Sequence, residues 1–300
     1  MYPASFEYIQ PTTLAEAARL LNERPEDAKL LAGGQSLIPL LKLRLAGPAL
    51  LLDIGRLPEL KGIRETEAGI EIGALVRHTE IQNSELLARA CPLLPETAAE
   101  VGDIAVRNRG TFGGSLAHAD PAGDFPAATL ALEAKFIATS VAGQRTIPAR
   151  EFFVDLMTTA LDPNEILTRV LVPKRGPRTG SAYVKMRQQA SGFAIVGVAS
   201  VVRLDSKGRV EEARVAITGV GPVPYRATMV EEKLRGQKPE DRAIAHAAAA
   251  AADGVDVTED LHASAEYRRE LTAVFTLRSL EKAAARARMN TSHDRERTHR

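Results

Sequence analysis

Two paired glycines constrain this chain most. They lie in Ala32-Gly33-Gly34-Gln35-Ser36 and Thr111-Phe112-Gly113-Gly114-Ser115, and each pair follows an apolar or strand-like stretch. Because glycine has no Cβ and reaches positive φ, such a turn lets the backbone approach a bulky anion closely. Two of them predict a ligand with two phosphates, or one long ligand held twice. Neither turn matches the G-x-G-x-x-G pattern or a Walker loop, so those phosphate-binding motifs are not predicted.

Composition narrows the function classes. A length of 300 residues fits two or three domains, and 45% hydrophobic with 26% charged residues is typical of a globular protein. The net charge of +1 gives no reason to expect nucleic acid as a partner. The single cysteine, Cys91, excludes an intrachain disulfide and an iron–sulfur cluster held by this chain alone, and the scattered histidines predict no metal site. Neither a membrane span nor a signal peptide is recognisable, so a cytoplasmic location is expected.

The first segment, residues 1–56, is expected to form a βαβ unit. Thr13 with Glu16 predicts a capped helix, residues 29–31 and 49–54 predict two buried parallel strands, and Ser36 is expected to cap the helix between them. The first glycine turn then lies where a strand passes into a helix. Unsatisfied N–H groups at such a junction suit a phosphate.

The rest of the chain predicts an α+β organisation with three further segments. Residues 57–174 carry strand-like stretches at 70–76, 135–141 and 166–172, and helices from Thr79, over 96–107, and after Asp124. A Pro- and Gly-rich linker at 173–178 opens the third segment, 175–287, with alternating strands and helices at 243–252 and 265–287. The arginine-rich residues 288–300 are expected to be a disordered tail.

Polar residues follow the second turn within a few positions. Asp120-Pro121-Ala122-Gly123-Asp124 adds two carboxylates to the hydroxyls of the turn. Hydroxyls and backbone amides suit phosphate, whereas a carboxylate suits sugar hydroxyls. Asp124 as a helix N-cap and Asp120 as a turn former are the structural alternatives. Arg107 and Arg109 fit either a phosphate-neutralising role or a solvated loop.

Both turns resemble those of the FAD-binding medium subunit of the molybdenum hydroxylases, the group of aerobic carbon monoxide dehydrogenase and xanthine dehydrogenase. The resemblance rests on Ala-Gly-Gly-Gln-Ser-Leu, on Thr-Phe-Gly-Gly-Ser-Leu followed by Asp-Pro-x-x-Asp, on the opening Phe6-Glu7-Tyr8, and on residues 219–227. It covers residues 1–285. It implies a two-subdomain FAD-binding fold of the PCMH/VAO type, followed by a small C-terminal α+β domain of antiparallel strands and helices.

The resemblance also implies the site residues. Both turns would wrap the FAD pyrophosphate and ribityl chain, Asp124 would contact FAD hydroxyls, Lys185 would approach the flavin, and Phe193 would lie beside the isoalloxazine ring, unless it is a core phenylalanine. No histidine or cysteine lies in either turn, so FAD is expected to bind non-covalently. The full set of expected cofactor-binding residues is Ala32, Gly33, Gly34, Gln35, Ser36, Leu37, Thr111, Phe112, Gly113, Gly114, Ser115, Asp124, Leu167, Lys185 and Phe193. No catalytic acid–base pair or nucleophile motif is recognisable.

The implied function is that of an electron-transfer subunit. In the family, a large molybdenum subunit oxidises the substrate, a small iron–sulfur subunit passes on the electrons, and the flavoprotein delivers them to an external acceptor. A dimer of heterotrimers is therefore expected, with carbon monoxide, an aldehyde or an N-heterocycle as substrate. Gln35 stands where carbon monoxide dehydrogenases carry a histidine, which leaves the substrate open. The alternatives are a self-contained FAD-dependent oxidase or reductase of the same fold, and a non-catalytic flavin-binding or assembly protein.

Overall fold

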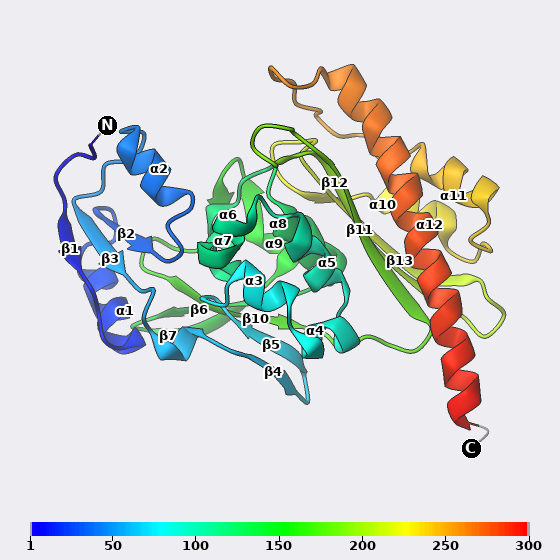
Figure 1. The fold of residues 1–300 in the computed structure, drawn as a ribbon, viewed down its shortest axis with the longest axis horizontal. Coiled ribbons are helices and arrows are strands. Elements are labelled where there is room, and N and C mark those ends of the chain that lie inside the picture. The colour runs from blue at the N-terminus through cyan, green and yellow to red at the C-terminus, as the bar shows by residue number, and fades with distance from the viewer. Residues whose placement is uncertain (1, 299–300) are drawn as a thin grey trace.

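A computed structural model describes residues 2–298, with side chains through residue 290. Its elements group into three regions along the chain, which Figure 1 shows from the blue N-terminal part to the long red C-terminal helix. No helix of the described residues is long and apolar enough to cross a membrane.

The first region is the predicted βαβ unit with one more strand. Strands β1 and β2 both pair in parallel with β3, in the order β1-β3-β2. Thr13 caps α1 as expected, since its hydroxyl accepts a 3.1 Å hydrogen bond from Glu16 N–H, whereas Ser36 makes no side-chain cap at α2. The elements are β1 (Glu7–Ile9), α1 (Leu14–Glu23), β2 (Ala28–Leu31), α2 (Leu37–Lys42) and β3 (Leu50–Asp53).

The second region is built on a five-stranded antiparallel sheet in the order β4-β5-β10-β6-β7, beside a two-stranded hairpin, β8-β9. Its strands are β4 (Ile63–Thr66), β5 (Gly69–Gly73), β6 (Lys135–Ser140), β7 (Gly143–Pro148), β8 (Phe153–Asp155), β9 (Thr158–Thr159) and β10 (Ile166–Val172). Its helices are η1 (Pro58–Leu60), α3 (His78–Gln82), α4 (Glu85–Ala90), α5 (Leu93–Glu100), α6 (Ile104–Arg109), α7 (Phe112–His118), α8 (Asp124–Ala131) and α9 (Ala149–Phe152).

Two helix predictions in this region were wrong in detail. The single helix expected over 96–107 is divided into α5 and α6, because Gly102 adopts φ +45° between them and Asp103 caps α6 by accepting from Val106 N–H at 2.8 Å. Helix α3 begins before Thr79, and its first turn is closed by the Glu80 carboxylate, which accepts from Arg77 N–H at 2.9 Å.

The third region is a four-stranded antiparallel sheet in the order β11-β12-β13-β14. Helix α12 packs on one face of this sheet, while α5 and α8 of the second region pack on the other (Figure 1). The sheet therefore joins the C-terminal part to the core of the second region. The elements are β11 (Thr179–Arg187), β12 (Ala194–Leu204), β13 (Val210–Thr218), β14 (Tyr225–Arg226), α10 (Thr228–Leu234), α11 (Asp241–Ala248) and α12 (Ala265–Thr298).

Helix α12 is longer than the sequence predicted. It was expected to end near Ala287 and to be followed by a disordered tail, but it continues to Thr298. The first residues of the expected tail are anchored, because Arg288 donates to Pro239 O and Asn290 donates to Thr179 O at 2.7 Å. Residues 299–300 lie outside the described part of the chain.

Candidate functional site

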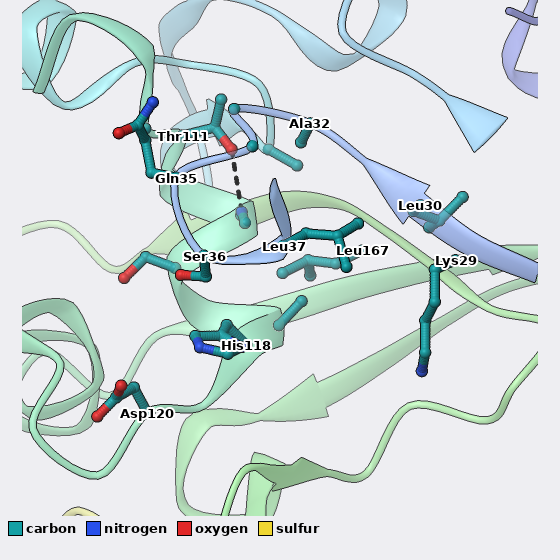
Figure 2. A pocket seen from close by; sticks show the side chains of 18 of the residues that line it. Lys29, Leu30, Ala32, Gln35, Ser36, Leu37, Thr111, His118, Asp120 and Leu167 are labelled. Atoms are coloured by element: carbon teal, nitrogen blue, oxygen red, sulfur yellow. Dashed lines mark hydrogen bonds between the residues drawn. The ribbon is translucent and has the colours of Figure 1, made fainter. Parts of the chain in front are cut away.

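A cavity of about 740 Å³ lies where the three regions meet. Its walls come from the first glycine turn, from the second glycine turn with the loop after α7, and from residues 191–193 of the C-terminal region. At its far end it is lined by residues of β2 and by the loop before β10. Figure 2 shows the first turn curving over the cavity, with Gln35 and Ser36 at the bend and His118 and Asp120 beyond them. A long cavity of this volume suits an extended organic ligand.

The two glycine turns are in contact through Arg109 and Gly110, which lead directly into the second turn. A Cβ added to Gly33 would lie 2.3 Å from Arg109 O and 2.9 Å from Gly110 Cα. Real Cβ atoms essentially never approach within 3.0 Å, so this contact requires glycine at position 33. The sequence had assigned the glycines to contact with an anion, whereas here one of them is needed for contact between the turns.

The first turn presents unused hydrogen-bond donors to the cavity. Gly33, Gly34, Gln35 and Ser36 all line it. Throughout the described part of the chain, no carbonyl or side chain accepts a hydrogen bond from the amides of these four residues. Gly34 sits at φ +76°, a conformation that favours glycine. Successive free amides in a turn form a concave anion-binding surface.

The second turn is different, because its amides are bonded inside the protein. Phe112 N–H donates to Val76 O at 2.8 Å, and Gly113 N–H donates to Ala74 O at 2.8 Å. Gly114 N–H donates to the Thr111 hydroxyl at 3.2 Å, the dashed line in Figure 2, and Ser115 N–H donates to Thr111 O at 3.0 Å. This turn is thus a fixed wall that contributes small side chains to the cavity, and no amide from Phe112 to Ser115 is left to donate.

The structure brings nearly all of the expected cofactor-binding residues together around this one cavity. The exceptions are Phe112 and Lys185. Phe112 is fully buried and packs edge-on against Phe125, with 4.9 Å between ring centroids. The Lys185 ammonium lies 2.8 Å from the Asp124 carboxylate. Residues that line the cavity as expected are Ala32, Gly33, Gly34, Gln35, Ser36, Leu37, Thr111, Gly113, Gly114, Ser115, Asp124, Leu167 and Phe193.

Asp124 is not the helix N-cap that was its structural alternative. Gly123 occupies the cap position of α8, and Asp124 is the first residue of the helix. Its carboxylate instead accepts from the Tyr183 hydroxyl at 2.6 Å and from the Lys185 ammonium. Burial raises the pKa of the Asp124 carboxyl, and the Lys185 charge opposes that rise. Asp120 does form the expected turn, since its carboxylate accepts from Ala122 N–H at 2.8 Å.

Sequence reasoning missed His78, which also lines the cavity. Only 4% of this residue is exposed, and its ring packs beside Phe125, 5.1 Å between centroids. Its Nδ1 is buried without a hydrogen-bond partner among the described residues. Burial and the Arg107 guanidinium lower the pKa of His78 to about 4, so the ring is neutral at pH 7. A single histidine near the start of a short helix gives no sequence signal that it lies in a cavity wall.

Among the described residues, no group of three or more His, Cys, Asp or Glu side chains is arranged to hold a metal ion. The site therefore consists of hydrogen-bond donors in the first turn, hydroxyls in the second, and buried carboxylate and imidazole groups behind them.

Comparison with known families covers almost the whole chain. Residues 4–175 match the FAD binding domain in molybdopterin dehydrogenase, and residues 181–283 match the CO dehydrogenase flavoprotein C-terminal domain. The 6-hydroxypseudooxynicotine dehydrogenase complex subunit alpha of Paenarthrobacter nicotinovorans is 40% identical over 96% of this chain and 97% of its own. The carbon monoxide dehydrogenase medium chain of Hydrogenophaga pseudoflava is 40% identical over 95% of this chain and 99% of its own.

Solved structures agree. A chain of the Hydrogenophaga pseudoflava carbon monoxide dehydrogenase that lacks the Mo-pyranopterin moiety of the molybdenum cofactor superposes with a TM-score of 0.92 over 95% of this chain and 99% of its own, at 40% identity. A chain of quinoline 2-oxidoreductase from Pseudomonas putida 86 gives a TM-score of 0.90 over 96% of this chain and 99% of its own, at 33% identity.

The cavity fits FAD chemically. Its two phosphates need donors such as the free amides of Gly33 to Ser36, and its hydroxyls need acceptors such as the carboxylates of Asp120 and Asp124. The predicted fold class, an FAD-binding fold followed by an antiparallel C-terminal domain, is confirmed as well. The chain belongs to the FAD-binding subunits of the molybdenum hydroxylases, the family of the carbon monoxide dehydrogenase medium chains, and is an enzyme component with FAD as its cofactor.

Proposed function

We propose that this chain is the electron-exit subunit of a three-subunit molybdenum hydroxylase. Electrons reach it from a small iron–sulfur subunit and leave it to an external acceptor, while a large molybdenum subunit oxidises the substrate. Bound FAD supplies the redox chemistry, and the protein supplies its position and electrostatic environment. The chain would work in the cytoplasm, in a dimer of heterotrimers.

One observation carries the proposal. The chain matches subunits of multi-subunit dehydrogenases over almost its whole length, 96% of it for the 6-hydroxypseudooxynicotine dehydrogenase complex subunit alpha and 95% for the carbon monoxide dehydrogenase medium chain. A self-contained oxidase of the same fold needs substrate-facing acid–base residues of its own. The cavity is lined by the donors and acceptors that FAD needs, so this alternative is disfavoured.

The substrate is proposed to be a small molecule bound entirely on the large subunit. Relatives with similar identity to this chain are named for unlike substrates, such as 6-hydroxypseudooxynicotine, carbon monoxide, glyceraldehyde and caffeine. A flavoprotein that serves such different reactions has no need to recognise the substrate. We propose carbon monoxide, an aldehyde or an N-heterocycle as the class.

Purification of the native complex tests this function. Two partner chains should copurify, and metal analysis should find iron and molybdenum in the intact complex. If neither metal is found, and the flavin of the chain alone is reduced when substrate is added, the self-contained enzyme would be supported instead. A substrate screen on the intact complex would then identify the reaction.

Within the cavity, we propose that the free amides from Gly33 to Ser36 bind the FAD phosphates. Asp124 accepts from FAD hydroxyls, and Phe193, which is 46% exposed at the cavity, lies beside the isoalloxazine ring. The two turns and Leu167 enclose the rest of the FAD molecule. Reconstitution with FAD should give a flavin spectrum, and acid precipitation should release all of the flavin. Flavin that remained on the precipitated protein would contradict non-covalent binding.

A further inference from the structure

The loop from Asp120 to Gly123, which leads into Asp124 at the start of α8, is held by the C-terminal region. Thr218 Oγ1 lies 2.7 Å from Pro121 O and 2.8 Å from Gly123 O, so its one hydroxyl proton is shared between these carbonyls, and Gly219 N–H donates to Pro121 O at 2.7 Å. These contacts give a physical role to Gly219, the first residue of the sequence 219–227 that contributed to the family resemblance. Residues outside the FAD-binding domain fix the backbone of one cavity wall.

The same region also holds the side chain of Asp124. Tyr183 OH donates to Asp124 Oδ1 at 2.6 Å, and Lys185 Nζ lies 2.8 Å from Oδ1 and 3.0 Å from Oδ2. Lys185 donates further to Glu100 O at 2.9 Å, and its side chain is completely buried. Both donors lie on β11, one on each side of Val184. The ammonium is therefore engaged by Asp124 and the Glu100 carbonyl, and Lys185 does not line the cavity.

We propose that Lys185 and Tyr183 are positioning residues for the cofactor, which hold the Asp124 carboxylate as a charged and oriented acceptor in the cavity wall. This inference rests on the proposed contact between Asp124 and FAD. It assigns part of cofactor binding to the C-terminal region, through residues that do not line the cavity.

The hydrogen-bond count of the carboxylate leaves room for this role. An ionised carboxylate has about four lone-pair positions. Tyr183 and Lys185 approach Asp124 from β11, and 5% of Asp124 remains exposed, where it lines the cavity. An acceptor position is therefore left for an FAD hydroxyl. A bond to a charged acceptor is worth about 1.5–3 kcal/mol, or about a 10- to 150-fold change in Kd.

Charge is the second contribution of Lys185. Burial raises the pKa of the Asp124 carboxyl, and the negative charge of Glu100 on α5 acts in the same direction. Lys185 is the cation that opposes both, while Tyr183 donates a hydrogen bond to the charged form. Asp120 and His118 line the same cavity from the loop and from α7. Without Lys185, the pKa of the Asp124 carboxyl should rise further, and a protonated carboxyl is a poorer acceptor for an FAD hydroxyl.

The test is a double-mutant cycle on the full-length chain. The variants are Asp124→Asn, Lys185→Met and the double variant, with Tyr183→Phe as a milder change. The Kd for FAD is measured by flavin fluorescence from pH 5.5 to 8.5. Each Kd is divided by the wild-type value at the same pH, which cancels the pH effects that all variants share.

Three results are expected. Lys185→Met should raise the Kd ratio at least about tenfold at pH 6, and the ratio should fall as pH rises and Asp124 regains its charge. In the Asp124→Asn background, the same substitution should change Kd less than about twofold, because its effect acts through Asp124. Tyr183→Phe should weaken FAD binding only when Asp124 is present. If Lys185→Met alone does not fold, the Tyr183→Phe cycle and the double variant still decide, since the neutral pair leaves no buried unpaired charge.

The outcomes separate the two proposals. An unchanged Kd for Asp124→Asn would overturn the proposed Asp124–FAD contact. If Asp124→Asn weakens FAD binding, but the effect of Lys185→Met simply adds to it and the Kd ratio of Lys185→Met does not change with pH, only the positioning role would be overturned. In that case Lys185 would act on FAD directly, as the family resemblance implied.

Discussion

Contact between the two glycine turns is tested by Gly33→Ala. The added Cβ would lie 2.3 Å from Arg109 O, whereas real Cβ atoms stay at or beyond about 3.0 Å. The turns must therefore separate by at least 0.7 Å, and because the obstacle is backbone, rotation of a side chain cannot relieve it. Overpacking of this kind costs about 1–3 kcal/mol.

The separation should reach the cofactor. The residues that carry the free amides of the first turn and the hydroxyls of the second line the same cavity, so a shift of one turn against the other alters their spacing. We expect the Kd for FAD to rise by about 10- to 100-fold and the free energy of unfolding without FAD to fall by about 1–3 kcal/mol. Titration with FAD and urea denaturation measure the two effects separately.

Gly47→Ala is the matched control. It places the same methyl group in the segment that follows α2, but nothing lies within 4 Å of the added Cβ and its φ is outside the left-handed region. This variant should behave as the wild type within about 0.5 kcal/mol. If Gly33→Ala binds FAD and unfolds as Gly47→Ala does, contact between the turns does not constrain the site, and the reasoning is refuted.

Three further predictions concern other parts of the fold. Gly114→Val should weaken FAD binding sharply, because a Cβ there lies 2.6 Å from the Thr111 hydroxyl that caps α7. Gly180→Ala should destabilise the C-terminal region by more than about 1 kcal/mol, since its Cβ would lie 2.1 Å from Ala283 O and push α12 off the sheet. His78 makes stability depend on pH. Its folded pKa of about 4 lies below the unfolded value near 6.5, so the unfolded state binds more protons in that window and stability falls as pH drops through it, by up to about 3 kcal/mol.

Each of the three has a measurement that decides it. An unchanged Kd in folded Gly114→Val would remove the second turn from the site. Gly180→Ala should lower the midpoint of urea denaturation, and an equal midpoint would show that α12 accommodates the methyl group. His78→Leu should lose the pH-dependent part of stability between pH 6.5 and 4. If the free energy of unfolding of the variant and of the wild type changed in parallel with pH, His78 would not titrate in this window.

Patterns local in sequence predicted their structures well. The apolar runs at 29–31 and 49–54 are the parallel strands β2 and β3, and the alternating stretches after the linker are strands of one antiparallel sheet. The glycine turns and the acidic residue after them do lie around one cavity. These features are readable because strand burial and turn chemistry leave periodic or compositional marks.

Features that depend on contacts distant in sequence were not readable. Asp124 and Lys185 are 61 positions apart, and nothing local to either indicates that they form a buried pair. The large apolar residues of α12 do not all mark its buried face either. Tyr267 and Val274 are 42% and 40% exposed, while Thr272 and Ser279 are buried against the sheet. Small polar side chains pack there because the helix lies close to strand carbonyls, which Ser279 reaches as a donor.

The contact between Gly33 and the Arg109 carbonyl has a consequence for exchange of sequence between relatives. A turn that leaves no space for one methyl group cannot be replaced without regard to its neighbour. Chimeras that import the first turn alone from another subunit should lose cofactor, whereas those that import both turns together should retain it. Substitutions at these two places are therefore expected to be inherited as a pair, although almost eighty positions of chain separate them.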